Sequence, residues 1–251
     1  MTIVAVGSWR GVGASTTALL LAAAGALDGR PAWLVEADPG GGVLTSRAPD
    51  LSGVDSLGAV AFGPHHDRPD RLLEYASRPL GQMRVVTAPW DSFKAWSALA
   101  SPRRPWLDGL RRLDGLIVVD VGSLRGGDVP VWQIVERADA LVMVTSPEPA
   151  ALTSTVAWMD AKGQSAPGVA GLSLDTSRLV VVDAPILAAE RFGPSVAGEL
   201  GDRLVGWWPW DPKVVDHVHR GGSLDHRSIR RSDLPAAARS TVDRLMEGVT
   251  G

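Results

Sequence analysis

Short runs of consecutive apolar residues recur along the whole chain, with helical stretches between them. The runs cover residues 3–6, 32–35, 84–86, 116–119, 141–144, 179–182 and 204–207. Continuous rather than alternating apolar runs are typical of strands that are buried on both faces, as in a parallel sheet covered by helices. The pattern therefore predicts an α/β fold: a doubly wound, mostly parallel sheet of about seven strands with helices on both faces, in which one strand could be antiparallel.

No repeat or linker divides the chain, so we expect residues 1–251 to form a single domain. Two stretches are less regular than the rest. The glycine- and proline-rich stretch 49–79 is interpreted as a loop followed by a short helix, and residues 235–248 as a C-terminal packing helix, because their apolar positions recur at helical spacing.

Composition excludes several classes of protein. Hydrophobic residues make up 45% of the chain and charged residues 21%, which excludes intrinsic disorder as the main state. The absence of cysteine excludes a disulfide scaffold and thiolate metal sites. No apolar stretch is long enough for a membrane span, and the first residues do not resemble a signal peptide, so a cytoplasmic protein without an integral membrane segment is expected. A net charge of −3 gives no overall attraction to nucleic acid.

A glycine-rich turn, residues 7–16, separates the first apolar run from an Ala/Leu-rich helix. A phosphate group suits this place, because backbone N–H groups converge there and the helix dipole is positive. The P-loop pattern is G-x-x-x-x-G-K-[ST]. In this chain Ser8 takes the first glycine position, Gly13 the second, Ala14 the lysine position and Ser15 the position of the Mg²⁺ ligand.

Two aspartates follow apolar runs that are predicted to lie beside this turn. Asp38 comes directly after the second run, and Asp120 closes a later run with Gly122 two residues on, which is the Walker B shape. Carboxyl ends of parallel strands meet at one edge of a sheet, where such folds bind their ligands. We therefore expect Asp38, Asp120 and the turn to lie together.

These motifs in combination resemble the MinD/ParA family of deviant-Walker P-loop ATPases, of the SIMIBI class. The family loop K-G-G-V-G-K-[ST]-T is matched by residues 9–16, its switch I by residues 36–45 and its switch II by residues 120–122. Further matches follow the later strands, at residues 144–148 and 208–211. Within the family, the loop is most similar to the CpaE/TadZ branch and to septum-site-determining proteins.

The resemblance implies a nucleotide site for ATP or ADP with Mg²⁺. The implied nucleotide-binding residues are Gly11, Val12, Gly13, Ala14, Ser15, Thr16, Asp183, Pro209 and Asp211. Ser15, Asp38 and Asp120 are the implied metal ligands, directly or through water, and Asp38 is also the catalytic position that orients the attacking water in active relatives. Trp208, Pro209 and Trp210 match positions near the adenine in this family. They could form a wall of the nucleotide pocket, form a surface for a partner, or pack in the protein interior.

Both lysines of the family motif are missing. Ala14 replaces the P-loop lysine, Trp9 replaces the signature lysine that reaches the partner's phosphates in a dimer, and no lysine occurs before Lys94. Loss of a charge-assisted contact weakens phosphate binding, and loss of that contact in the transition state slows hydrolysis. We expect weak or absent ATP hydrolysis. Arg10 could compensate in part or point to solvent, and Trp9 could stack on a base, meet a partner or pack within the chain.

The function implied by the resemblance is to position or regulate a cellular assembly in division, partition, pilus formation or secretion. It implies a protein partner, a homodimer, and recruitment to a pole, the septum or the nucleoid. Two alternatives stay open. One is nonspecific DNA binding by Arg220, Arg227, Arg230 and Arg231, and the other is a nucleotide-free pseudoenzyme scaffold.

Other chemistries lack their essential residues. The turn also fits a short-chain dehydrogenase, and Asp38 could bind an NAD ribose, but no lysine follows a tyrosine in the Tyr-x-x-x-Lys spacing that such enzymes use for proton transfer. There is no G-x-S-x-G elbow for a serine hydrolase and no cysteine nucleophile. His217 and His219 could bind a metal, although a solvated helix end explains them as well.

Overall fold

The computed structural model of the protein describes residues 1–9, 11–51, 56–64, 68, 72, 78–100, 105–124, 130–165, 177–185 and 190–249. Its centre is an eight-stranded sheet in the order β3-β4-β2-β5-β1-β6-β7-β8. The strands are β1 (Thr2–Ser8), β2 (Ala32–Glu36), β3 (Arg78–Leu80), β4 (Met83–Val86), β5 (Leu116–Ser123), β6 (Ala140–Thr145), β7 (Ser177–Asp183) and β8 (Leu204–Pro209). All neighbours pair in parallel except β3 and β4.

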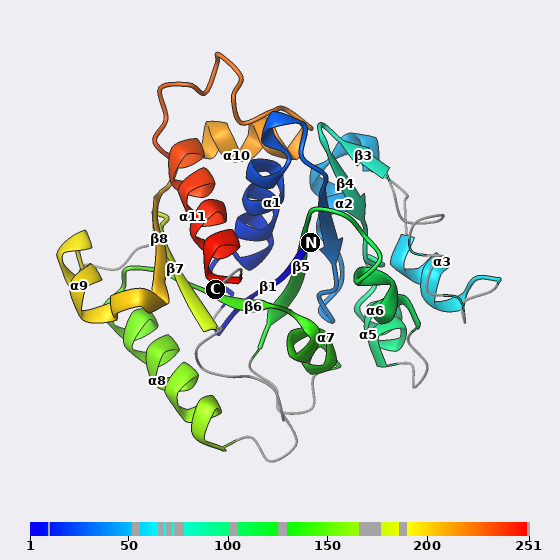
Figure 1. Ribbon diagram of the computed structural model, residues 1–251, viewed down its shortest axis with the longest axis horizontal. Helices are drawn as coiled ribbons and strands as arrows, with labels where there is room; N and C mark the ends of the chain where they lie inside the picture. The colour runs from blue at the N-terminus through cyan, green and yellow to red at the C-terminus, as the bar shows by residue number, and fades with distance from the viewer. Residues whose placement is uncertain are drawn as a thin grey trace.

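Helices cover both faces of this sheet (Figure 1). The α-helices are α1 (Ala14–Gly25), α2 (Leu44–Arg47), α3 (Ser56–Phe62), α5 (Ser92–Ala100), α6 (Pro105–Leu110), α7 (Trp132–Arg137), α8 (Pro149–Ser165), α9 (Ala197–Leu200), α10 (Pro212–His219) and α11 (Leu234–Val249). Single 3₁₀ turns lie at Leu27–Gly29, Pro49–Leu51, Pro194–Val196 and Gly201–Arg203.

Two hydrophobic cores lie on opposite faces of the sheet, and they explain the continuous apolar runs. In β1, Val4 and Val6 enter the core beneath α1, α10 and α11, whereas Ile3 and Ala5 enter the core beneath α3, α5, α6, α7 and α8. Side chains alternate between the faces of a strand. Since both faces of β1 are buried, its central positions from Ile3 to Val6 are all apolar.

The seven predicted strands are confirmed, but the expected count is one too low. The additional strand, β3, pairs antiparallel with β4 across a tight turn at Gly81, where φ is +62°. This edge strand is three residues long and contains Pro79, so it lacks the apolar run that identifies the other strands. The stretch interpreted as a loop and short helix contains α3 and then β3 among its described residues, and α11 confirms the predicted C-terminal helix.

None of the helices in the described part of the chain is both long enough and apolar enough to cross a membrane.

His219, the last residue of α10, is a buried histidine with no hydrogen-bond partner for either ring nitrogen among the described residues. Burial lowers its pKa to about 4, and the nearby positive charge of Arg47 acts in the same direction, against a smaller opposing effect of Asp216. The folded protein therefore holds this imidazole in its neutral form.

The wild-type protein should lose stability as the pH falls below about 6.5, and replacement of His219 by leucine should remove that loss. Below about pH 6.5 the unfolded wild-type chain takes up a proton that the folded chain excludes until about pH 4, so the free energy of unfolding falls across that window. Relative to pH 7.5, His219→Leu should gain roughly 2 kcal/mol over wild type near pH 5. Urea titrations at the two pH values measure the gain, with the exposed His226→Leu as control. Equal pH slopes for wild type and His219→Leu would contradict the prediction.

Candidate functional site

The turn between β1 and α1 is open toward solvent on the side where a phosphate is expected. Gly11 and Gly13 have φ values of +69° and +97°, which disfavour any other residue, and a Cβ on either would meet nothing within 4 Å. Gly13 is the N-cap of α1, and no described side chain caps that helix. The Ser8 hydroxyl accepts a hydrogen bond from Gly11 N–H at 3.0 Å, so this amide is satisfied within the loop. The remaining first-turn amides of α1 form an anion-binding end.

Ala14, at the lysine position, is buried, and only 5% of its surface is exposed. Its neighbour Ser15 is half-buried, and Thr16 is buried. A methyl group therefore stands where the P-loop pattern has an ammonium group. Any phosphate held at this turn would rely on backbone N–H groups and on the helix dipole.

Asp120 lies in the sheet beside this turn and is almost fully buried. Gly122 N–H donates to its Oδ1 at 3.0 Å, and the Ser15 hydroxyl also hydrogen-bonds to its side chain. Burial is the main cause that raises the pKa of this carboxyl to about 7. The hydrogen bond from Ser15 lowers the pKa, the charges of Asp38 and Glu36 raise it, and the bond from Gly122 lowers it.

Asp38 stands over the turn that follows Asp120. Gly40 N–H donates to its Oδ1 at 2.7 Å, and burial raises the pKa of its carboxyl above the ordinary value. Gly122, with φ at +64°, passes so close that a Cβ there would overlap the Asp38 carboxyl group. The structure thus brings Ser15, Asp38 and Asp120 together, as the sequence predicts; their binding roles stay predictions.

Glu36, for which the sequence argument predicts no role, is the most completely bonded carboxylate of this site. It is fully buried at the end of β2. Its Oε1 accepts hydrogen bonds from Val43 N–H at 2.6 Å and Leu44 N–H at 2.9 Å, and its Oε2 accepts one from Ala88 N–H at 3.0 Å. Burial raises the pKa of Glu36, and the three backbone bonds oppose that shift. An acid that ends a fully buried strand is the sequence signal that could have found it.

Trp9, at the signature-lysine position, packs within its own chain. Its ring centroid lies 5.5 Å from that of Trp158 on α8, and Trp158 lies 6.0 Å from Trp132 on α7. Through these ring contacts, the start of the loop packs against α7 and α8 on one face of the sheet. Intrachain packing is thus the alternative for Trp9 that the geometry supports, whereas Arg10 lies outside the described residues.

The residues predicted near an adenine lie at the same sheet edge, but on β7 and β8 beyond β6. Asp183 pairs with Arg191 at 2.9 Å and stands opposite Pro209 in the strand register. Asp211 caps α10 by accepting from Lys213 N–H at 2.9 Å, and a hydrogen bond from the Ser232 hydroxyl is the main cause that lowers the Asp211 pKa. Trp208 is buried and donates to Thr241 Oγ1 at 2.9 Å, so buried packing explains this ring.

The C-terminal arginines lie after α10, in the segment that leads to α11 (orange in Figure 1). Arg220 pairs with Asp216 on α10 at 3.0 Å. Arg227, Arg230 and Arg231 are exposed. Within the described ranges, no group of three or more His, Cys, Asp or Glu residues is arranged to hold a metal ion, so His217 and His219 belong to no such group.

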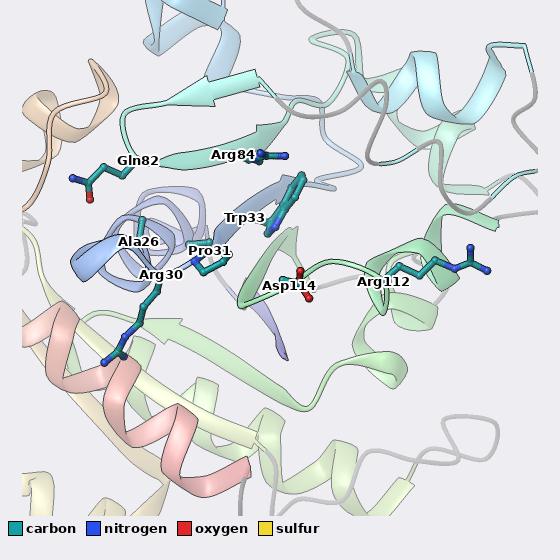
Figure 2. Close-up of a pocket in the computed structure, with 10 residues that line it drawn as sticks. Ala26, Arg30, Pro31, Trp33, Gln82, Arg84, Arg112 and Asp114 are labelled. Carbon is teal, nitrogen blue, oxygen red and sulfur yellow. The ribbon is translucent and has the colours of Figure 1, made fainter.

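A cleft of about 630 Å³ lies at the opposite edge of the sheet, where β2, β4 and β5 begin. Figure 2 shows Arg84 beside Trp33, with Asp114 between the strands, while Arg30 and Arg112 point away from the middle. The Arg84 guanidinium carbon lies 5.2 Å from the Trp33 ring centroid. None of the predicted nucleotide-site residues lines this cleft.

No protein-family model and no curated protein matches the chain. Solved structures do match, over nearly the full chain. The cell division ATPase MinD of Pyrococcus furiosus is 19% identical with a TM-score of 0.72, and the match covers 98% of both chains. A ParA family ATPase from Chlorobium tepidum is 17% identical with a TM-score of 0.72, covering 98% of this chain and 97% of that one. MinD of Pyrococcus horikoshii, complexed with Mg-ADP, is 17% identical with a TM-score of 0.72, covering 100% and 98%. The chain therefore has the MinD/ParA fold.

Replacement of Asp120 by asparagine should stabilise the protein above neutral pH. Because its pKa is raised to about 7, the carboxyl of the folded protein is protonated below about pH 7, whereas the carboxyl of the unfolded chain is ionised above its ordinary pKa of 3.8. Asp120→Asn removes the buried charge and keeps an acceptor for Gly122. The gain should be about 2–4 kcal/mol at pH 8 and should vanish as the pH falls from 7 toward 4.

Chemical denaturation of both proteins across this pH range measures the effect, and the exposed Asp202→Asn serves as control. A variant that is less stable than wild type at pH 8, or a difference that does not change with pH, would count against a buried, protonated Asp120.

Proposed function

We propose that this protein positions or regulates a cellular assembly and responds to nucleotide through a degenerate phosphate loop. The assembly would belong to division, partition, pilus formation or secretion, and the protein would act by contact with one of its components, as a homodimer. The observation that carries the proposal is the cluster of the open glycine turn, Ser15, Asp38 and Asp120 at one sheet edge. The MinD/ParA fold supports it.

Nucleotide phosphates fit the turn through backbone groups. The N–H groups of Gly13, Ala14, Ser15 and Thr16 would hold them at the start of α1. Hydroxyl and carboxylate oxygens are ligands that suit Mg²⁺, and the bonded pair of Ser15 and Asp120 offers both. Bound Mg²⁺ would supply positive charge that offsets the phosphates. Ala14 contributes no side-chain donor, so we infer weak binding.

Hydrolysis is inferred to be weak or absent for the same reason. Charge that develops on a phosphoryl group needs preorganised positive groups beside it. Ala14 cannot provide one, and the Trp9 ring packs on Trp158 of its own chain. Asp38, whose carboxyl accepts from Gly40 N–H, would then shape the loop rather than serve catalysis. If no nucleotide binds at all, the same fold would act as a scaffold.

Calorimetric titration with ATP and ADP, with and without Mg²⁺, tests the proposal. Micromolar affinity is expected for a nucleotide-responsive protein, and phosphate release should not exceed that of a Ser15→Ala/Asp38→Ala double variant. Absence of heat with either nucleotide would contradict nucleotide binding and favour the scaffold, whereas steady phosphate release well above the double variant would contradict weak hydrolysis.

Restoring the missing charge should strengthen binding. In Ala14→Lys, the ammonium group adds a charge-assisted contact to a phosphate, and we expect roughly tenfold tighter ATP binding than in wild type. Ala14→Met has a side chain of comparable length without charge and separates the charge effect from a steric one. Equal affinities of the lysine and methionine variants would argue against phosphates at this turn.

Nonspecific DNA binding is a second candidate function. Arg227, Arg230 and Arg231 are exposed, and no ion pair of theirs occurs within the described part of the chain, so their charges are available to phosphates. Asp225 and Asp233 flank the same segment and reduce its net charge. The candidate rests on this local cluster alone.

If this candidate holds, random duplex DNA should bind weakly and lose affinity steeply as salt rises. Arg230→Ala/Arg231→Ala should lower the slope of log K against log salt by about 2, because two phosphate contacts are lost. A fluorescence anisotropy titration at several salt concentrations gives the slope, with Arg239→Ala on α11 as control. Unchanged binding by the double variant would remove this candidate.

A further inference from the structure

The cleft where β2, β4 and β5 begin is lined by more positive than negative side chains. Arg30, Arg84 and Arg112 line it, together with one acid, Asp114. The whole chain has a net charge of −3, so this excess of positive charge is local. The volume of about 630 Å³ falls within the roughly 300–1,000 Å³ of ligand-binding pockets. A cleft of this size with an excess of positive charge attracts anionic ligands.

The guanidinium groups of the three cleft arginines are open to a ligand. All three arginines are exposed, and within the described ranges none of them forms an ion pair. The neighbouring Arg111 differs, because its guanidinium donates to the Asp139 carboxylate at 2.9 Å and to Arg137 O at 2.6 Å. The positive charge of Arg111 is thus balanced within the protein, whereas the charges that line the cleft are not.

Arg84 is positioned by the protein itself. It is the single exposed residue of β4 and stands opposite Trp33 in the register of β2 and β4. Its guanidinium carbon lies 5.2 Å from the Trp33 ring centroid, within the range of a cation–π interaction. A guanidinium that is held in place before a ligand arrives loses less conformational entropy when it binds a carboxylate.

The backbone beneath the cleft is fixed as well. Leu116 N–H donates to Pro31 O at 3.1 Å, and Thr2 N–H donates to Gly115 O at 3.0 Å. Gly115 has a φ of +84°, and a Cβ there would overlap the Pro31 carbonyl group, so the two segments are in tight contact. The cleft is therefore formed before binding, as most ligand sites are.

The placement and chemistry of the lining residues distinguish among anions. Arg30 and Arg112 lie on opposite sides of the cleft and point away from its middle, with Arg84 on a third side (Figure 2). A compact anion cannot contact all three, whereas an elongated ligand that crosses the cleft can. Asp114 is exposed and needs hydrogen-bond donors, because a carboxylate only accepts. An acidic peptide offers both carboxylates and backbone N–H groups, whereas polyphosphate and the DNA backbone offer no donors.

We propose that this cleft binds an acidic segment of a partner protein in an extended conformation. Alternate side chains of an extended segment point the same way, so acidic residues at every second position reach the three arginines. The side chains of Asp114 and Gln82 bind the backbone of the segment. As a description of the partner, this inference rests on the proposed function, in which the protein acts by contact with a component of an assembly. Binding itself needs no nucleotide, because the phosphate turn lies at the opposite edge of the sheet.

Fluorescence anisotropy with a labelled peptide of alternating glutamate and alanine tests the cleft without nucleotide. Wild-type protein should bind this peptide saturably at low salt, with a Kd below about 1 mM. Arg84→Gln/Arg112→Gln should bind it at least about tenfold more weakly, because two charge-assisted contacts are lost. Arg230→Gln/Arg231→Gln removes the same charge from the segment before α11 and should bind like wild type. A peptide with glutamine in place of glutamate should not bind.

Circular dichroism and thermal melting establish that both double variants are folded. The proposal is overturned if wild type shows no saturable binding, if the cleft variant binds like wild type, or if the loss occurs in Arg230→Gln/Arg231→Gln instead. It is also overturned if inorganic tripolyphosphate or single-stranded oligothymidylate binds more tightly than the peptide and loses affinity in Arg84→Gln/Arg112→Gln, since the cleft then holds phosphates. Nucleotide titrations of the cleft variant should match wild type, so failure here leaves the test of the proposed function unaffected.

Discussion

The carboxylate of Glu36 holds the two loops at the functional edge of the sheet in one arrangement. Its oxygens accept three backbone N–H groups, two from the residues that open α2 and one from Ala88 after β4. A buried carboxylate without such donors would be costly, and buried amides without an acceptor would be as well. The position of Asp38, and of the segment that carries Trp90, therefore depends on this one side chain.

The same edge brings three acids close together, of which Glu36 and Asp120 are buried and Asp38 is half-buried. Glu36 and Asp120 stand opposite each other in the register of β2 and β5, and Asp38 lies over Gly122. Burial is the largest cause that raises the pKa of each carboxyl, nearby carboxylates raise the pKa further at Glu36 and Asp120, and Ser15 is the described side chain that hydrogen-bonds to Asp120. Three acids thus lie close together at an edge of the sheet where Ala14 occupies the lysine position.

The sequence predicts the sheet well where burial on both faces leaves an unbroken apolar run, as in β1 and β5. It misses β3, because a short edge strand with Pro79 at its centre has no such run and is held by pairing with β4. The juxtaposition of Ser15, Asp38 and Asp120 is predictable for a geometric reason: parallel strands bring their carboxyl ends to one edge. The hydrogen bonds of Glu36 are not predictable from the sequence, because their donors are the backbone N–H groups of residues 43, 44 and 88, which only the folded chain brings together.

The sequence by itself determined the α/β architecture, the place of the phosphate turn and the loss of both lysines, since these depend on local residue types and on strand order. The tertiary structure decided where the side chains at that turn point. Trp9 packs on Trp158, which lies far along the chain. It also decided that α5 turns Phe93 and Trp96 outward, while Ala95, Ala98 and Leu99 form its buried side. Contacts between distant segments, which no local pattern encodes, set both arrangements.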